Sequence, residues 1–436
     1  MRLQDHSGAG SAVWVGQVVL VCGFCVWLGG CGPSSGPPEE PPAGEAVTRL
    51  ARVRGPEILD PEGRQLQIRG IGLGNWLLPE GYMFRFERTA SPRMIAELTA
   101  QLLGPSGARN FWKTFRERYV TTDDLRFLKE AGFNTVRVAI DYRIFTPEDH
   151  PEVWLDEGFQ LLDALVDDCR RLGLYVILDL HGAPGGQNGE NIDNGWGFPW
   201  LFESEASQAR TEEVWRRLAA RYRNEPAVLG YELLNEPIPH FPEYAYLNPR
   251  LEPLYRRITE AIRTVDPHHI IILGGAQWNT NFSVFGPPWT DNLVYAFHRY
   301  WEDVTPELIR PYTEFRDRYQ VPVFMSESGE NTDEWIRDFR ELLESEHIGW
   351  CFWPYKKMET ASCVVTIPVP EGWETIQAFA EREERGYEAV RKFRPDLGLA
   401  RRTLEEFLEK VQFSNCRPNP AYLEALGLSL PATAER

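Results

Sequence analysis

The chain has 436 residues, of which 43% are hydrophobic and 25% charged, and its formal net charge is −18. This composition is typical of a globular protein with enough residues for one large core or two smaller domains. The acidic excess argues against nucleic acid as a partner, because phosphate binding requires clustered Lys and Arg side chains.

The N-terminal region has the pattern of an export signal. Residues 12–28 are apolar and almost uncharged, and they follow Arg2. This length and position predict the hydrophobic region of a signal peptide rather than a membrane span of the mature protein. The sequence LGGC at 28–31 resembles a bacterial lipobox, so we expect residues 1–31 to be a lipoprotein signal peptide with Cys31 as lipid anchor. The alternative is a plain cleaved signal peptide and a secreted protein.

Residues 32–46 are rich in Pro, Gly and Glu, which predicts a solvated tether. No second linker interrupts residues 47–436, so we expect one catalytic domain there, acting as a monomer. An exported protein can form disulfides, but the spacing of the remaining cysteines assigns no pairs. No Cys and His cluster has zinc-site spacing, and we expect neither a metal nor a cofactor.

Short apolar runs alternate with longer amphipathic runs through this domain. The apolar runs lack strict alternation, which is typical of parallel strands buried on both faces. Eight strands alternating with helices predict a (β/α)8 TIM barrel. A doubly wound open sheet is the alternative, but residues 71–74 lack the third Gly and the helix start of its phosphate-binding turn. The expected strands are 67–73, 135–140, 174–180, 228–234, 270–274, 292–297, 321–325 and 348–352, and the expected helices are 122–131, 157–172, 207–222, 251–265, 306–319 and 333–344.

Two connections are long: residues 76–118, with a helical stretch at 92–103, and residues 182–206. Long loops in compact domains are usually functional or disordered, and both of these follow strands at the end where barrels place active sites. After the last strand we expect helices at 373–393 and 404–410 that complete the outer ring.

Polar and aromatic side chains follow almost every expected strand at its carboxyl end. Strand interiors are apolar, so this convergence predicts a functional site at that end of the barrel. In strand order, from the second strand to the eighth, these side chains are Arg137, His181, Asn235, Glu236, Trp278, His298, Tyr300, Glu327 and Trp353.

Two of these residues are carboxylic acids from opposite sides of the barrel mouth. Hydrolysis of a glycoside needs an acid on the leaving oxygen, and a retaining enzyme also needs a carboxylate nucleophile about 5–5.5 Å away. Arg137 and Tyr300 would keep Glu327 ionised, which leaves Glu236 as the protonated partner. Glu232 and Glu330 are rivals, but the first lies inside a strand and the second lies on a loop beyond Gly329.

The remaining side chains suit a sugar substrate. Asn235 could donate to the sugar 2-hydroxyl, and His181 and His298 could contact hydroxyls or the acid. Trp353 could form a flat floor for the sugar ring. Other Trp residues on the long loops and near the strand ends are expected to shape the subsites, although core packing explains any single Trp equally well. These are Trp76, Trp196, Trp200, Trp278 and Trp289.

From Arg69 to Trp353 the chain resembles glycoside hydrolase family 5, which contains cellulases and related β-glycanases. That family is described by an ordered set of Arg, His, Asn-Glu, His, Tyr, Glu and Trp. The matching positions are Arg137, His181, Asn235, Glu236, His298, Tyr300, Glu327 and Trp353. The resemblance implies that Glu236 is the acid/base and Glu327 the nucleophile. Residues 178–189 resemble the corresponding loop of members that act on β-glucans.

One segment departs from the family pattern. Many members have Gly-Glu-Phe-Gly around the nucleophile, whereas residues 326–329 here are Ser-Glu-Ser-Gly. The difference bears on the subfamily and leaves the Glu in place.

The expected function is hydrolysis of a β-glucan or related β-glucoside with retention. A non-catalytic glycan-binding lipoprotein is disfavoured because both carboxylates are present. A transglycosylase that uses the same covalent intermediate stays open, as do the linkage and the choice between endo and exo attack.

Overall fold

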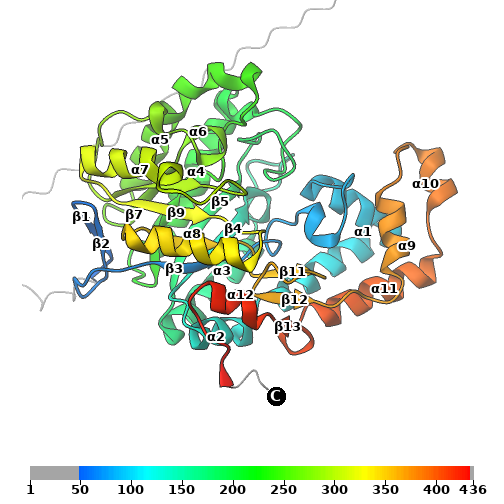
Figure 1. The fold of residues 1–436 in the computed structure, drawn as a ribbon. Coiled ribbons are helices and arrows are strands. Elements are labelled where there is room, and N and C mark those ends of the chain that lie inside the picture. Colours follow the sequence, from blue (N-terminus) through cyan, green and yellow to red (C-terminus); the bar gives the residue numbers. More distant parts are fainter. Residues whose placement is uncertain (1–48, 433–436) are drawn as a thin grey trace, which may run out of the picture. The chain divides into compact units, whose positions relative to one another are not determined.

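The computed structural model describes residues 49–432; the expected signal peptide, Cys31 and the whole of the expected tether lie outside this part. Eight parallel strands form a closed barrel in the order β10-β3-β4-β5-β6-β7-β8-β9, which confirms the predicted (β/α)8 fold (Figure 1). β10 pairs with both β3 and β9 and so closes the ring. The barrel strands are β3 (Arg69–Gly72), β4 (Thr135–Asp141), β5 (Tyr175–Gly182), β6 (Val228–Glu232), β7 (Ile270–Gly274), β8 (Leu293–His298), β9 (Val323–Glu327) and β10 (Gly349–Phe352).

Six helices at the expected positions cover the barrel, with ends within a few residues of the prediction. Local signals explain where they stop: Gly132 and Gly173 take left-handed conformations at the ends of α2 and α3, where a residue without a Cβ is favoured. The six are α2 (Thr122–Ala131), α3 (Asp156–Leu172), α4 (Glu205–Tyr222), α5 (Asn248–Arg263), α7 (Pro306–Tyr319) and α8 (Asp333–Ser345).

The barrel strands are buried on both faces, which explains why their sequences do not alternate. One face contributes to a small interior cluster that includes Ile177, Ile272 and Phe324, and the other packs in a large cluster under the helices. A hairpin that the sequence did not predict, β1 (Arg52–Arg54) and β2 (Glu57–Leu59), adds Ala51 and Ile58 to the interior cluster. The hairpin therefore covers the amino-terminal end of the barrel.

The segments outside the barrel differ most from the prediction. The helical stretch expected at 92–103 is the first part of α1 (Pro92–Tyr119), which bends at Gly104. The continuous helix expected at 373–393 is wrong, because Gly386 is extended and separates α9 (Trp373–Ala380) from α10 (Tyr387–Phe393). The helix expected at 404–410 begins earlier, as α11 (Leu397–Lys410), because the Asp396 side chain caps it.

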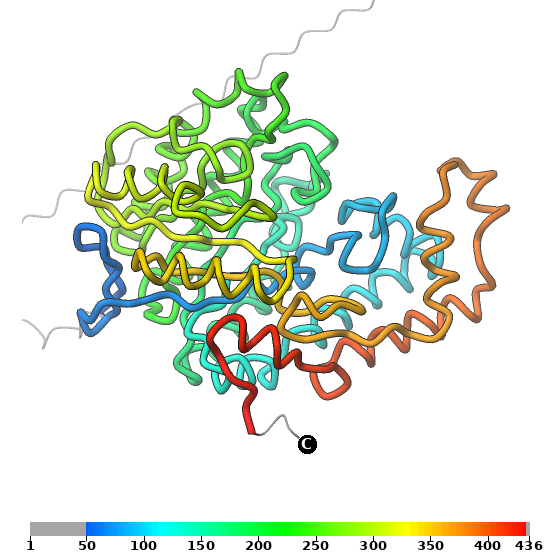
Figure 2. Tube along the Cα trace, in the orientation of Figure 1, coloured from blue at the N-terminus to red at the C-terminus, as the bar shows by residue number. Residues whose placement is uncertain are grey.

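These added helices lie beside the barrel as a lobe, in which α1 and α11 run side by side (Figures 1 and 2). Phe111 and Phe115 of α1 stack on Phe407 of α11. The α9 segment also holds the loop between β3 and α1: the Trp373 indole donates to the carbonyl of Phe84 at 3.0 Å, and the Glu381 carboxylate accepts from the backbone N–H groups of residues 87 and 88. The last part of the chain therefore fixes a loop at the barrel mouth.

The remaining elements are short. A three-stranded sheet follows the barrel, with β11 (Lys356–Met358), β12 (Val365–Ile367) and β13 (Arg417–Pro418), and α12 (Pro420–Ala425) comes after it. The other turns are η1 (Gly81–Phe84), η2 (Tyr142–Ile144), η3 (Trp200–Phe202), η4 (Pro242–Leu247), α6 (Ala276–Asn279), η5 (Phe282–Val284) and η6 (Phe413–Asn415).

Within residues 49–432, Cys169, Cys351, Cys363 and Cys416 are free thiols. No helix in this range combines the length and apolarity needed to cross a bilayer.

Candidate active site

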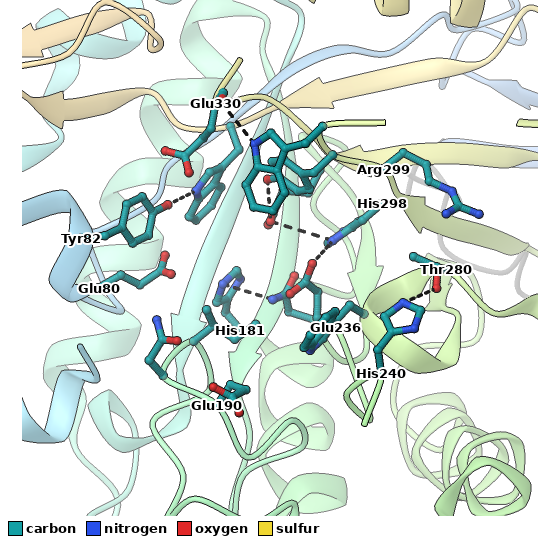
Figure 3. A pocket seen from close by; sticks show the side chains of 18 of the residues that line it. Glu80, Tyr82, His181, Glu190, Glu236, His240, Thr280, His298, Arg299 and Glu330 are labelled. Carbon is teal, nitrogen blue, oxygen red and sulfur yellow. Dashed lines mark hydrogen bonds and ion pairs between the residues drawn. The ribbon is translucent and has the colours of Figure 1, made fainter. Parts of the chain in front are cut away.

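A cavity of about 680 Å³ opens at the carboxyl ends of the barrel strands (Figure 3). Arg137 lies beneath the cavity with no exposed surface. The barrel thus brings the predicted site residues into one place. Those that line the cavity are His181, Asn235, Glu236, Trp278, His298, Tyr300, Glu327 and Trp353.

Arg137 is the centre of a buried ion-pair network. Its guanidinium lies 2.7 Å from Glu327, 2.6 Å from Glu232 and 3.1 Å from Asp179. Such a network is favourable only when each buried charge has close partners, as it has here. Glu232 is fully buried in β6 and does not line the cavity, so its contact with Arg137 makes it a support for the site rather than a second acid.

Glu327 ends β9 with both carboxylate oxygens occupied by donors. Nη1 of Arg137 lies 2.7 Å from Oε2, and the Tyr300 hydroxyl donates to Oε1 at 3.0 Å. A charge-assisted and a neutral hydrogen bond both stabilise the anion. The surroundings therefore suit Glu327 to act as an ionised group.

Glu236 has different surroundings. It follows β6 with a φ of 45°, and its Oε1 lies 2.8 Å from Nδ1 of His298. Burial raises the pKa of Glu236 to about 7, and burial lowers the pKa of His298 to about 4. Near neutral pH a neutral imidazole therefore faces a carboxyl group that can hold a proton.

The two carboxyl groups face each other closely. Ligand atoms of Glu236, His298 and Glu327 all lie within 4.8 Å of one another. This spacing is near the separation typical of retaining glycosidases, about 5–5.5 Å, and well below the roughly 6.5–9.5 Å of inverting ones. The same three side chains are close enough to ligate a cation, but a cation bound there would be repelled by Arg137, which already neutralises Glu327.

His181 and Asn235 are fixed by a chain of hydrogen bonds. Arg137 donates to Oδ1 of Asn235 at 2.7 Å, so the amide nitrogen must point the other way, toward Nε2 of His181 at 3.2 Å. Nδ1 of His181 in turn donates to Asp179 at 2.7 Å. The His181 ring stacks on Trp353 with centroids 5.3 Å apart. One N–H of Asn235 stays available to a substrate.

Sequence reasoning missed a set of residues at one side of the cavity. Glu80 is 2% exposed and one of its carboxyl oxygens has no partner, and burial raises its pKa well above the usual range. The Tyr82 hydroxyl accepts from the Trp353 indole at 2.8 Å. Figure 3 shows both residues on the side of the cavity opposite His240 and Thr280. The only sequence signal was their place on a long loop after the first barrel strand.

Glu330 and Lys357 complete that side. Their side chains form an ion pair at 2.5 Å, and the Lys357 ammonium lies over the Tyr82 ring at 4.4 Å. Glu330 thus lines the cavity but is paired with a cation, whereas Glu327 faces Glu236. Lys357 belongs to β11, beyond the part of the chain that carried sequence motifs.

Most of the Trp residues expected to shape subsites do not line the cavity. Only Trp278 of that set does so. Trp76 is 3% exposed and packs in the core. Trp196 lies outside the cavity, where Cζ of Arg93 is 3.7 Å from the centre of its ring. Trp301, which was not predicted, lines the mouth and is 69% exposed. Spacing along a sequence cannot distinguish a core Trp from one that contacts a ligand.

The chain is similar to several known proteins. The model of the family Cellulase (glycosyl hydrolase family 5) matches residues 98–359. A beta-xylosidase of Phanerodontia chrysosporium is 30% identical over 343 residues, which cover 70% of each chain. Endoglucanase C of Acetivibrio thermocellus is 26% identical over 311 residues, 57% of this chain and 88% of that one.

Solved structures share the fold at lower identity. A crystal structure of an endogalactoceramidase aligns with a TM-score of 0.54 at 19% identity, covering 72% of this chain and 76% of that one. A rutinosidase from Aspergillus niger aligns with a TM-score of 0.55 at 19% identity, covering 68% of this chain and 92% of that one.

Proposed function

Since the chain belongs to glycoside hydrolase family 5 and is a β-glycoside hydrolase, we propose that it retains anomeric configuration and acts by double displacement on a β-glucan or related β-glucoside. The observation that carries the proposal is the close approach of Glu236 and Glu327, within 4.8 Å. That spacing leaves no room for the water that an inverting enzyme places between its carboxylates.

The surroundings of the two acids support their roles. Glu327 is held as an anion by Arg137 and Tyr300, as a nucleophile requires. Glu236 has its pKa raised to about 7 by burial, as a general acid at neutral pH requires. Two carboxyl groups with opposed surroundings are the pattern from which acid and nucleophile are assigned.

The first step forms a glycosyl–enzyme ester. A Glu327 oxygen attacks the anomeric carbon while the bond to the leaving oxygen breaks, and that oxygen takes the proton of Glu236. The second N–H of Asn235, which is not directed at His181, can donate to the substrate 2-hydroxyl, and this hydrogen bond strengthens as positive charge develops on the sugar. Trp353 supplies a flat surface under the ring.

The second step returns the enzyme to its starting state. Glu236, now ionised, accepts a proton from a water molecule that attacks the same anomeric carbon. The ester bond to Glu327 breaks, and the carboxylate regains its contacts with Arg137 and Tyr300. Two inversions at one carbon give net retention.

A β-glucoside is the proposed substrate because the loop at residues 178–189 resembles that of β-glucan-active members of the family. Relatives named as an endoglucanase and as a glucan 1,3-beta-glucosidase support the same choice. The beta-xylosidase relative makes the aryl β-xyloside the necessary comparison substrate.

The test follows the product anomer by proton NMR during hydrolysis of phenyl β-glucoside. We expect β-glucose to appear first and to mutarotate later, and α-glucose as the first product would contradict the proposal. A 2-deoxy-2-fluoro-glucosyl fluoride should label Glu327 in peptide mapping, and a label on Glu330 would show that the nucleophile is misassigned. Phenyl β-xyloside and β-1,3- and β-1,4-linked gluco-oligosaccharides then define the sugar and linkage.

We also propose that the protein is exported and anchored through a lipid on Cys31, on the basis of the LGGC sequence at 28–31. Mass spectrometry of the membrane fraction should find acyl chains on Cys31, and Cys31→Ser should abolish incorporation of labelled fatty acid into the protein. An unmodified N-terminus downstream of residue 31 would contradict the anchor.

A further inference from the structure

Three consecutive residues after β7 have left-handed backbone conformations, although none of them is glycine. The φ angles are 55° at Gln277, 56° at Trp278 and 59° at Asn279. Left-handed conformations are unfavourable for residues with a Cβ, and they persist only where the surrounding structure enforces them. Here Ala276 and Asn281 exchange two backbone hydrogen bonds across the turn. Strain of this kind clusters at functional sites.

The turn places two adjacent side chains at the site. Trp278 lines the cavity, while Asn279 is fully buried with its Nδ2 3.1 Å from Nε2 of His298. The amide oxygen of Asn279 lies against Gly274, where an added Cβ would come within 2.2 Å of it. Gly274 therefore leaves the space that lets Asn279 reach the imidazole.

Ser326 contacts the same nitrogen of His298. Its Oγ lies 2.9 Å from Nε2, and the residue is fully buried in β9. Ser326 stands directly before Glu327, where many members of the family have Gly. The departure from the family pattern thus adds a hydroxyl that can donate to His298.

The Asn279 amide turns its nitrogen toward His298, while its oxygen has no hydrogen-bond partner. An amide nitrogen can only donate a hydrogen bond, so in this orientation Nε2 of His298 accepts and carries no hydrogen. The neutral ring then carries its hydrogen on Nδ1, 2.8 Å from Oε1 of Glu236. We propose that Asn279 and Ser326 are positioning residues that hold His298 in this tautomer, so that the proton of Glu236 stays on the oxygen that faces the leaving group. The inference rests on the proposed role of Glu236 as the general acid.

The opposite tautomer would present a lone pair to Glu236. The carboxyl proton would then bond to Nδ1 and would be turned away from the substrate. Burial lowers the pKa of His298 to about 4, so the ring is neutral at working pH and its tautomer matters. The charged or titratable groups that face this pair from the neighbouring strands are Arg137, His181, Glu232 and Glu327.

Asn279→Asp tests the proposal, because an ionised carboxylate can only accept and so requires a hydrogen on Nε2. Two substrates distinguish a loss of acid catalysis from a general loss of activity. The leaving group of phenyl β-glucoside needs a proton, and that of 2,4-dinitrophenyl β-glucoside does not. We expect kcat/KM to fall about 100-fold on the phenyl substrate and to stay within about threefold on the dinitrophenyl substrate. The alkaline limb of the pH profile should move to lower pH.

Ser326→Gly should give a smaller loss of the same kind, about threefold on the phenyl substrate alone, because Asn279 still donates to Nε2. Gln277→Gly is the matched control: it changes the same left-handed turn without touching His298, and we expect both substrates to behave as with the wild type. An equal loss on both substrates in Asn279→Asp, or no loss on either, would overturn the proposal.

The wild-type protein offers a test that does not depend on folding of a variant. Nitrogen-15 NMR of labelled histidine, with His298 assigned by comparison with His298→Gln, should show hydrogen on Nδ1 and none on Nε2. A hydrogen on Nε2 would overturn the proposal. Glu236→Gln distinguishes a failure of the proposed general acid from a failure of the proposed positioning residue. It should lose activity on the phenyl substrate more strongly than Asn279→Asp does, again with little loss on the dinitrophenyl substrate. If it does not, the role of Glu236 is wrong, rather than that of Asn279.

Discussion

Two regions of the pocket are built from different parts of the chain. The pocket floor consists of side chains of the barrel strands and of the residues that follow them, chiefly Arg137, Glu236 and Glu327 with their partners, and buried ion pairs hold it. The pocket rim consists of Glu80, Tyr82, Glu330 and Lys357, which come from loops and from β11. The floor is suited to bond cleavage, whereas the rim is placed to contact parts of the sugar that do not react. The order of the barrel strands sets the positions of the floor residues, and packing between distant segments sets those of the rim residues.

We expect the largest difference in activity between the variants Glu327→Gln and Glu330→Gln. Glu327→Gln removes the proposed nucleophile, and we expect kcat to fall by about 10⁴-fold or more, the scale of losing a catalytic nucleophile. Glu330→Gln should change activity by less than about tenfold, because this residue belongs to the rim. Initial rates on phenyl β-glucoside measure both, and similar losses would remove the distinction between floor and rim.

Arg137→Met should break the floor itself. The substitution leaves Glu232, Asp179 and Glu327 buried without their cation, and we expect a loss of about 3–5 kcal/mol in the free energy of unfolding. Urea denaturation measures this. Arg118→Met is the matched control, since Arg118 pairs with Glu409 at the surface and should cost less than about 1 kcal/mol. Equal effects would show that the network does not hold the floor.

Glu236→Gln should stabilise the protein at alkaline pH, although we expect it to slow hydrolysis of phenyl β-glucoside. The folded pKa of about 7 exceeds the ordinary value of 4.5, so above pH 7 the wild type holds an unfavourable buried anion. We expect the variant to be more stable by about 1–3 kcal/mol at pH 8, with the difference vanishing below pH 4.5. The difference in the free energy of unfolding between variant and wild type should grow from pH 4.5 to pH 7. Urea titrations at pH 4, 6 and 8 measure it, and a difference that does not change with pH would contradict the raised pKa.

The wild-type pH profile follows from the same shift. The acid form of Glu236 is present below about pH 7 and is lost above it, so kcat/KM on phenyl β-glucoside should fall above about pH 7. A profile that stays flat to pH 9 would contradict the assignment.

At the rim, Glu80 should affect binding more than chemistry. Burial raises the pKa of Glu80 and so favours its neutral form, which Gln resembles in size and hydrogen bonding, and Glu80→Gln should change KM by less than about threefold. Glu80→Ala removes the group and should raise KM about tenfold with a smaller change in kcat, as expected for one lost hydrogen bond. A loss mainly in kcat would move Glu80 from the rim to the floor.

Lys357→Met should have the smallest effect. It leaves Glu330 without its cation and Tyr82 without the ammonium above its ring, and we expect a rise in KM of about two- to fivefold. Lys410→Met removes a similar ion pair, with Glu406, outside the pocket and should leave KM unchanged.

The sequence predicted the barrel and the pocket floor because both follow from patterns that are local along the chain. Glu236 and Glu327 stand at or just after the ends of strands whose apolar runs are visible, Arg137 lies inside β4, and a closed barrel must bring these strands together. The turn at Gln277, the contact of Asn279 with His298 and the pairing of Glu330 with Lys357 depend on side chains that meet only after folding. No spacing in the sequence predicts them.

The same reason explains the errors. Trp76 was expected near a subsite because it begins a long loop, yet its indole donates to the carbonyl of Arg116 inside the core. The helix expected at 373–393 is interrupted, because the Glu381 carboxylate binds the backbone of residues 87 and 88 where α9 ends, and Gly386 is extended before α10. Tertiary contacts overrode local preference in both places.

The bond from the Trp373 indole to the carbonyl of Phe84 joins residues 289 positions apart. During synthesis the loop that carries Glu80 and Tyr82 leaves the ribosome soon after the first barrel strand, while the helix that clamps it emerges only after the eighth. Domains generally fold as units. We therefore expect the wall of the pocket at Glu80 and Tyr82 to be complete only after the last part of the chain has left the ribosome.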